Sequence, residues 1–444
     1  MTSRVPQAAY VWVYLPGDVE PTLCGRFDHK VTADRAVGSF VYGRSYLANT
    51  RALAIDPVAL PLHGDRLFET VSEQGTFGVI SDAIPDDWGR YVIDRRHGKQ
   101  DFPVGYLLHS LDDRVGNLSF SAHDAERPPL RRESAPLPGL RLLDDALRIV
   151  AGLEAGQWVP PELEDRIMLN TAMGGARPKL TIAHEGAQWL AKLPSRRDDP
   201  EIPAARLEAA MLDLASQCGI GTAQARVVNL EGGDVLLVKR FDRTLIASEG
   251  QASGWARDAY LSARSVFASR PAVQAYSFAG SYPRLARELG RYSSHPLNDR
   301  HELFRRMVFN CATSNTDDHD RNHGFIANDD PNASPGTYRL APAFDLVPRI
   351  HGTSRRFQAL AVGDGGHAPG IDNIMSSHAA FDLTEAAALG IVDDVQATVA
   401  DRWRHCLKNQ DLSALALRRL SKCFEPLPAM ATKDVEGGSA PVAR

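Results

Sequence analysis

The chain has 444 residues, of which 43% are hydrophobic and 24% are charged, and its formal net charge is −5 with an isoelectric point near 6.3. At roughly 150 residues per domain, this length predicts two or three domains. The charge balance argues against a globally basic nucleic-acid-binding protein, although it leaves room for a local basic face.

Residues 1–125 have the pattern of a small α/β unit. The stretches "YVWVYL" and "GSFVYG" are short, aromatic and β-branched, which favours strands. The segment "ISDAIPDDWGRYVIDRR" is expected to become helical after Pro85. A polar, proline-rich stretch over residues 123–140 then has the composition of a linker or a surface loop.

Residues 126–250 are expected to form the next unit, starting with helical spacing in "RLLDDALRIVAGLEAG". Residues 171–194 are typical of a glycine turn between two short strands, with a second turn at "HEG". A helix over "ARLEAAMLDLASQCG" has Leu207, Met211 and Leu214 as its apolar stripe and is stopped by a glycine. The stretch "DVLLVKRFDR" predicts a hydrophobic strand that ends in charged residues.

Residues 251–428 are expected to form a mainly helical unit, because the helical pattern dominates from Tyr282 onward. It is clearest in "LFRRMVFNCATSN" and in "LTEAAALGIVDDVQATVADRWRHCLKN". Residues 429–444 have the composition of a disordered tail. The elements together predict an α+β fold.

The five cysteines lie far apart and form no CxxC pair. A disulfide framework or a structural zinc site is therefore not expected, and a reducing compartment fits best. The N-terminus lacks the pattern of a signal peptide, and no apolar run reaches the roughly 18 residues that a membrane helix needs. We expect a cytoplasmic protein that does not bind a membrane.

The stretch "NTDDHDRNHGF", residues 315–325, holds three aspartates, two histidines and two asparagines. A calcium loop of the EF-hand type needs glycine at its sixth position, where His323 stands, so the turn chemistry argues against calcium. A zinc-protease motif would pair His319 with His323 but needs a glutamate directly after the first histidine. Asp320 occupies that place, and no third zinc ligand stands out.

Phosphoryl transfer fits the same stretch better. In a kinase catalytic loop, an aspartate accepts the proton of the substrate hydroxyl, and an asparagine five residues later binds magnesium. Asp317 and Asn322 have this spacing. A second metal-binding aspartate then follows a strand, as Asp345 does in "YRLAPAFDLVP". Mg²⁺ prefers oxygen ligands, so this carboxylate and carboxamide suit it.

The other parts of a kinase site occur upstream in the required order. "GGARPK" offers a glycine turn whose backbone N–H groups can approach phosphate oxygens. Lys192 would place a point charge on the phosphates, and Glu208 on the next helix is the candidate that orients it. Simpler explanations stay open for each part: Asp317 as a helix cap, Lys192 as an exposed lysine, Glu208 as a solvated helix residue, and the histidines as hydrogen-bonded loop residues.

These motifs resemble the HipA family of bacterial serine/threonine kinases, which are toxins of type II toxin–antitoxin systems. The resemblance covers residues 11–420, including "KRFDR" and, near the N-terminus, "FGVISDAIPDDWGR". It implies a two-lobed protein-kinase-like fold, with a β-rich N-terminal lobe and a mainly α-helical C-terminal lobe. It also implies ATP and Mg²⁺ as cofactors.

The resemblance implies partners as well. One is a small helix-turn-helix antitoxin of the HipB type, through which DNA would be contacted only indirectly. Another is a protein substrate, either glutamyl-tRNA synthetase or another aminoacyl-tRNA synthetase, whose phosphorylation arrests growth. Two other functions stay open: a kinase-like scaffold that binds an antitoxin and operator DNA without transferring phosphate, and a small-molecule phosphotransferase.

By resemblance, Asp317 matches the catalytic base, and Asn322 and Asp345 match the metal ligands, which also contact ATP. His319 lies in the part of the catalytic loop that touches nucleotide. The phosphate loop, the ATP lysine and the adenine-holding segment match Gly174, Gly175, Ala176, Arg177, Pro178, Lys179, Lys192, Lys239, Arg240 and Phe241.

The chain departs from the family pattern at two places. In the family, autophosphorylation of one serine inactivates the kinase. The position of that serine is occupied here by Ala172, beside Thr171. Either Thr171 substitutes for it in a shifted register, or this self-regulation is missing. Lys239 stands where some members have an acidic residue, so an adenine contact there would be made through the backbone.

Overall fold

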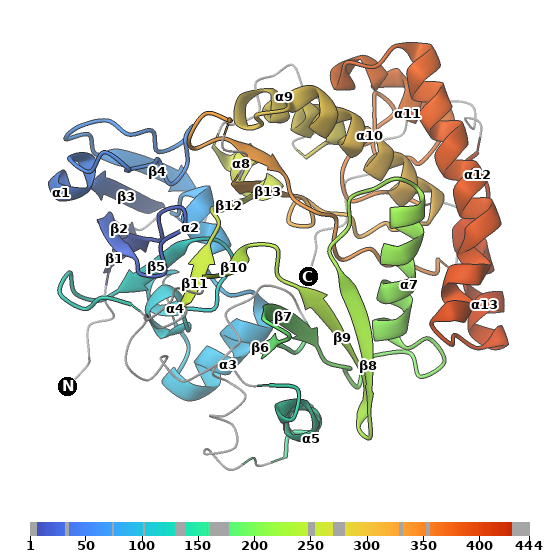
Figure 1. The fold of residues 1–444 in the computed structure, drawn as a ribbon, viewed down its shortest axis with the longest axis horizontal. Helices are drawn as coiled ribbons and strands as arrows, with labels where there is room; N and C mark the ends of the chain where they lie inside the picture. Colours follow the sequence, from blue (N-terminus) through green and yellow to red (C-terminus); the bar gives the residue numbers. More distant parts are fainter. Residues whose placement is uncertain are drawn as a thin grey trace.

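The structure is a computed structural model, and it describes residues 7–31, 35–72, 75–100, 103–128, 139–157, 159, 177–246, 254–269, 280–327, 332–351 and 356–428. Strands dominate the N-terminal half of the chain, and helices dominate the C-terminal half (Figure 1). The predicted α+β fold class is therefore confirmed. The predicted domain limits stay predictions, and the predicted tail lies outside the described residues.

The N-terminal part is built on a five-stranded antiparallel sheet in the order β4-β3-β2-β1-β5. Its alternating apolar residues, such as Val11, Phe27 and Phe40, are fully buried in the main core. The strands are β1 (Ala8–Val13), β2 (Thr22–Val31), β3 (Ala36–Tyr42), β4 (Phe68–Ser72) and β5 (Leu118–Ser121), and the helices are α1 (Arg44–Leu47), α2 (Gly78–Asp82), α3 (Asp87–His97) and α4 (Pro103–His109).

A second antiparallel sheet has four strands in the order β6-β7-β9-β8, with α5 and α7 beside it (Figure 1). Helix α7 forms where Leu207, Met211 and Leu214 give an apolar stripe, and it ends before Gly219, whose φ of +74° suits a glycine. The elements are α5 (Leu142–Glu154), β6 (Lys179–His184), β7 (Ala187–Lys192), α7 (Ala204–Gln217), β8 (Ala225–Leu230) and β9 (Gly233–Lys239).

The C-terminal part packs helices around one long helix, α12, which contacts both α7 and α10. Two small sheets join it to the rest. The sequence predicted the strand that precedes Asp345, but not the strand that begins at Gly324. The elements are β10 (Arg243–Ile246), β11 (Gly254–Arg257), β12 (Tyr260–Ser262), α8 (Ala263–Ala268), α9 (Tyr282–Tyr292), α10 (Pro296–Ala312), β13 (Gly324–Ala327), β14 (Tyr338–Leu340), α11 (Ile371–Ser376), the 3₁₀ helix η2 (His378–Phe381), α12 (Glu385–Asn409), α13 (Ala414–Leu420) and the 3₁₀ helix η3 (Ser421–Phe424).

The four-stranded sheet separates two environments because successive side chains of a strand point to opposite faces. On one face, Trp189 and Ala191 of β7 pack with the apolar side of α5. On the other face, Leu236 and Val238 of β9 pack with residues of α7 and of the C-terminal part. The alternation places Lys192 on this second face, between the sheet and the helical part.

A buried network of charged residues joins the N-terminal part to the end of β9. Arg240 donates to Asp242 at 2.8 and 3.0 Å and to the backbone carbonyls of Asp113 and Arg114 at 2.7 and 3.0 Å. Arg243 also pairs with Asp242, at 2.8 Å. Burial alone would raise the pKa of the Asp242 carboxyl, but the two guanidinium groups outweigh burial and hold that pKa well below its usual value.

All five cysteines are buried and none forms a disulfide. No helix within the described residues combines the length and the apolar character needed to cross a bilayer.

Replacing Asp242 with alanine should lower the free energy of unfolding by about 3–5 kcal/mol, because it leaves two buried guanidinium groups without their carboxylate. Urea unfolding at neutral pH measures this. Asp28→Ala is the matched control, since its pair with Arg26 lies on the surface and should cost less than about 1 kcal/mol. Equal losses in the two variants would contradict the structural role given to Asp242.

Candidate functional site

The candidate site is centred on Lys192, the last residue of β7. Its Nζ lies 2.7 and 2.9 Å from the two carboxylate oxygens of Glu208 and 2.9 Å from Oδ1 of Asp345. The Lys192 and Glu208 side chains are only 14% and 7% exposed, which excludes the alternatives of a surface lysine and a solvated helix residue. The Asp345 side chain is 45% exposed, so one side of this carboxylate is open to a ligand.

Local structure explains why Asp345 reaches Lys192. The backbone before it is tied to the segment between α7 and β8, through Ala343 N to Gly221 O at 2.8 Å and Ala223 N to Ala343 O at 2.9 Å. Asp345 itself has a φ of +59°, an uncommon conformation for a residue other than glycine. This backbone turn redirects the chain just where the carboxylate meets the ammonium group.

The charges of the three groups depend on one another. Burial alone would lower the pKa of Lys192, but Asp345 and Glu208 outweigh burial and raise it. The Lys192 ammonium lowers the pKa of Asp345, whereas burial raises that of Glu208. Lys192 is therefore protonated and Asp345 ionised at neutral pH.

A second lysine lies beside the first. Lys179 of β6 is the direct cross-strand partner of Lys192 and is 7% exposed. Burial, followed by the Lys192 ammonium, lowers the pKa of Lys179 to about 8. Two neighbouring ammonium groups at a partly open site are suited to a polyanion such as a polyphosphate.

Residues 315–323, which include the predicted base Asp317, form a tight loop between α10 and β13. The backbone N–H groups of His319 and Asn322 donate to the carbonyls of Asp317 and His319, at 2.8 and 2.9 Å. Below them, Asn315 bonds to Asn310 at 3.0 Å, and Gln358 donates to the Asn315 carbonyl at 2.9 Å. The loop is therefore held from α10 and from the segment that follows Asp345.

Asp317 and Asn322 differ in their surroundings. The Asp317 side chain is 49% exposed and pairs with Arg349, whose side chain is 57% exposed. Asn322 is only 8% exposed, and its Nδ2 donates to the Asp317 carbonyl at 3.2 Å, which leaves Oδ1 as the end that can face a cation. Because Arg349 lies four residues after Asp345 and pairs with Asp317, the segment that follows Asp345 runs along this loop.

Within the described residues, no three His, Cys, Asp or Glu side chains gather as a metal site. Mg²⁺ in phosphate-binding sites is held by one or two protein carboxylates together with phosphate oxygens and water. The half-exposed Asp345 carboxylate and the Asn322 carboxamide fit that donor set. They include neither a histidine nor a cysteine, which supply most of the ligands in protein zinc sites.

The other predicted nucleotide residues are placed as follows. Arg177 pairs with Asp198 at 2.7 Å, and the Pro178 carbonyl accepts from Leu193 N at 3.0 Å. Lys239 N donates to the Gln224 carbonyl at 2.8 Å, and Phe241 packs against Phe344, with ring centroids 6.0 Å apart. The predicted residues Thr171, Gly174, Gly175 and Ala176 lie outside the described residues.

Arg240 differs from the other members of the predicted adenine-holding segment. Its guanidinium group is 1% exposed and belongs to the network with Asp242. The side chain therefore holds the N-terminal part in place, and any contact of Arg240 with a nucleotide would have to come from its backbone.

The sequence motifs did not assign a contact that the N-terminal part makes with the catalytic loop. Asp86 pairs with Arg321, which lies between Asp317 and Asn322 in the sequence. The Asp82 carboxylate accepts hydrogen bonds from the backbone N and the hydroxyl of Ser262 at 2.7 and 2.6 Å, which ties the N-terminal part to β12. Both aspartates lie in "FGVISDAIPDDWGR", a stretch that the sequence analysis singled out. The sequence did not show which residues they would contact.

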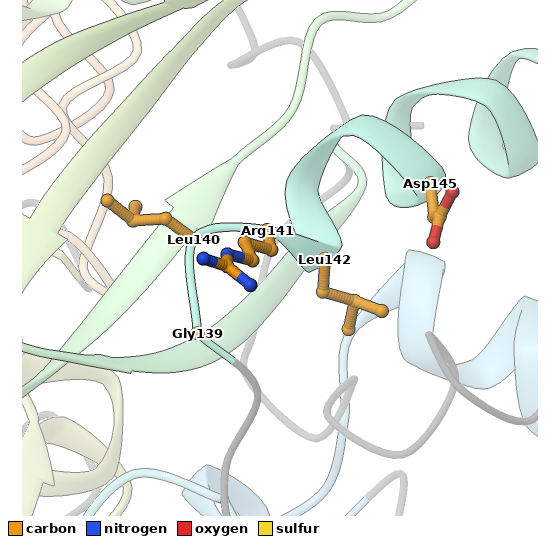
Figure 2. Close-up of a pocket in the computed structure, with 5 residues that line it drawn as sticks. All are labelled: Gly139, Leu140, Arg141, Leu142 and Asp145. Carbon is orange, nitrogen blue, oxygen red and sulfur yellow. The ribbon is translucent and has the colours of Figure 1, made fainter.

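A surface hollow of about 590 Å³ lies at the start of α5 and has a different character (Figure 2). Leu140 and Leu142 pack against the sheet face that carries Trp189, which is the face opposite to Lys192. The hollow is therefore separate from the candidate site. It is lined by Gly139, Leu140, Arg141, Leu142 and Asp145.

Comparison with family models matches residues 171–403 to the HipA-like C-terminal domain. This match spans more than half of the chain, and the chain therefore belongs to the HipA family. It includes Lys192, Glu208, Asp317, Asn322 and Asp345. A comparison with curated proteins finds no match.

Among solved structures, the chain is similar to one from the HipA, HipB and operator DNA complex of the Shewanella oneidensis MR-1 toxin–antitoxin system. The TM-score is 0.66 and the identity 14%, over 94% of this chain and 96% of that chain. At this identity the likeness supports the fold, and the predicted two-lobed fold class is confirmed. A Helicobacter pylori proinflammatory kinase, CtkA, matches with a TM-score of 0.34 and 12% identity over 56% of this chain and 92% of that chain, which is too low to support an argument.

Proposed function

We propose that the chain is an ATP- and Mg²⁺-dependent kinase that phosphorylates serine or threonine hydroxyls of a protein. The observation that carries this proposal is the convergence of Lys192, Glu208 and Asp345, together with the Arg349 ion pair that ties Asp317 to the segment just after Asp345. A scaffold without catalysis has no need for all of these groups in one place. Bound MgATP would supply the phosphoryl group and the cation that offsets its charge.

The roles of the residues follow from their positions. Lys192, held by Glu208, would bind phosphate oxygens, and Lys179 beside it would bind a further one. Asp345 and Asn322 would hold the cation through oxygen atoms. Asp317 is half exposed, so its carboxylate can orient an acceptor hydroxyl and take its proton.

The partners are proposed from the family. The similar Shewanella oneidensis chain was solved with HipB and operator DNA, which supports a HipB-like helix-turn-helix antitoxin as a partner of this chain. DNA would then be reached through the antitoxin. The proposed protein substrate is an aminoacyl-tRNA synthetase, with glutamyl-tRNA synthetase as the first candidate, and the proposed place of action is the cytoplasm.

Asp317→Asn should abolish phosphate transfer, by a factor of about 10³ or more, because the carboxamide cannot take the hydroxyl proton. Transfer from radiolabelled ATP to purified glutamyl-tRNA synthetase, other synthetases and the chain itself would measure this. Asp320→Asn is the matched control, since that carboxylate pairs with Arg264 on the surface and transfer should stay within about threefold. Undiminished transfer by Asp317→Asn would show that the assigned base is wrong.

Binding of a non-hydrolysable ATP analogue should weaken about tenfold between pH 7 and pH 9. The pKa of Lys179 is lowered to about 8, so its ammonium group is mostly present at pH 7 and mostly lost at pH 9. Calorimetric titration at several pH values measures this dependence. Lys179→Arg, which stays charged throughout, should flatten the profile, and an unchanged slope in that variant would contradict the role of Lys179.

A further inference from the structure

The segment that follows Asp345 has an unusual charge for this chain. Residues 346–363 contain three arginines and one histidine and neither aspartate nor glutamate, whereas the whole chain has a net charge of −5. The structure describes residues 346–351 and 356–363 of it. No function assigned so far uses these charges.

This segment runs along the catalytic loop on the side of Asp317. The Arg349 side chain pairs with Asp317, and its backbone N donates to the Ser314 carbonyl at 3.0 Å. Arg356 donates to the Ser314 hydroxyl, and His351 Nε2 lies 3.0 Å from the Thr316 hydroxyl. The positive charges therefore lie where an acceptor hydroxyl must arrive to meet Asp317.

Two large apolar side chains stand next to these arginines and are open to solvent. Ile350 is 46% exposed and Phe357 is 58% exposed. Each directly follows one of the two arginines, Arg349 and Arg356. Exposed apolar side chains beside a reaction site are candidates for contact with a partner protein.

The two arginines also lie close to one another in space. Both contact Ser314: the backbone N of Arg349 donates to its carbonyl at 3.0 Å, and the side chain of Arg356 donates to its hydroxyl. Among the described residues, the carboxylate that pairs with either arginine is that of Asp317 itself. A partner with carboxylates of its own would complement this surface.

We propose that Arg349, Ile350, Arg356 and Phe357 form the docking surface for the acceptor protein, and that this surface selects a hydroxyl flanked by acidic and apolar residues. The inference rests on the proposed function, because it assigns the acceptor of the same site. Charge complementarity argues for acidic residues, and the exposed Ile350 and Phe357 argue for a polypeptide rather than a nucleic acid, whose backbone offers phosphates but no apolar side chains.

Docking would also change the pairing of Asp317. In the free chain the Asp317 carboxylate is engaged by Arg349. An acidic residue of the acceptor competes for that guanidinium group and so frees a carboxylate oxygen of Asp317 for the hydroxyl. Acidic acceptors would thus both bind better and meet a base that is ready to accept the proton.

The test is binding and phosphorylation of synthetic peptides by the full chain with Mg²⁺. The peptides share a central serine and differ in flanking residues, which are Asp with Leu, Ala alone, or Lys with Leu. Binding is measured by fluorescence anisotropy with a non-hydrolysable ATP analogue, and transfer with ATP. The acidic–apolar peptide should bind at least about fivefold more tightly than the alanine peptide, since charge pairs on a surface are each worth a modest amount.

Two variants and a control locate the preference. Arg356→Glu should remove the preference for the acidic peptide, and Phe357→Ser should remove the preference for leucine. Arg402→Glu is the control, since Arg402 is exposed on α12 and pairs with Asp401. Thermal unfolding checks that each variant is folded. A preference that persists in Arg356→Glu overturns the proposal.

The design separates this inference from the proposed function. Selective binding of acidic peptides without transfer supports the docking surface and contradicts the kinase. Transfer without any acidic preference supports the kinase and overturns the docking surface. Binding of single-stranded DNA or tRNA in place of the acidic peptides, lost in Arg356→Glu, also overturns the inference, because the surface would then serve a nucleic acid.

Discussion

The ammonium group of Lys192 is the interaction on which the rest of the candidate site depends. It joins the sheet to Glu208 on α7 and to Asp345, which stands 153 positions further along the chain. A lysine with so little exposure is stable only with such partners, because an unpaired buried charge is costly. The ion pairs therefore fix three separate segments in one place. The site is built at the boundary between the β-rich and the helical part, where neither part could form it alone.

The N-terminal part supports this site from two sides. Through the network of Asp242 it holds the chain just beyond β9, next to the segment proposed to hold adenine. Through Asp86 it holds Arg321 within the catalytic loop. The first of these contacts is buried and the second is partly exposed. The N-terminal part thus helps to position two segments of the candidate site.

The sequence predicted the fold well where local pattern decides the structure. The stripe of Leu207, Met211 and Leu214 defines α7, and the turn at residues 184–186 defines the hairpin of β6 and β7. The strand β13 was missed, because it is short and gains its stability from pairing with β12 and β14 rather than from its own sequence.

The candidate site was predicted as far as residue types and their order allow. The sequence predicted that Lys192, Glu208 and Asp345 belong to one site, and the structure places them in contact. The sequence could not predict the ion pairs of Asp86 with Arg321 and of Arg349 with Asp317. Each pair joins two segments that come together only in the folded chain, and no sequence motif links them. The nucleotide contact of Arg240 stays a prediction, and its guanidinium group belongs to the buried network, which the sequence did not indicate.

Binding of a non-hydrolysable ATP analogue with Mg²⁺ to the wild type and to Lys192→Met is the most direct test of the account. Calorimetry should detect one site in the wild type and a loss of affinity of at least about tenfold in the variant, because a buried charge-assisted contact with phosphate is worth roughly 1.5–3 kcal/mol. Equal affinity in both proteins, or no binding to the wild type, would contradict the claim that Lys192 centres a nucleotide site.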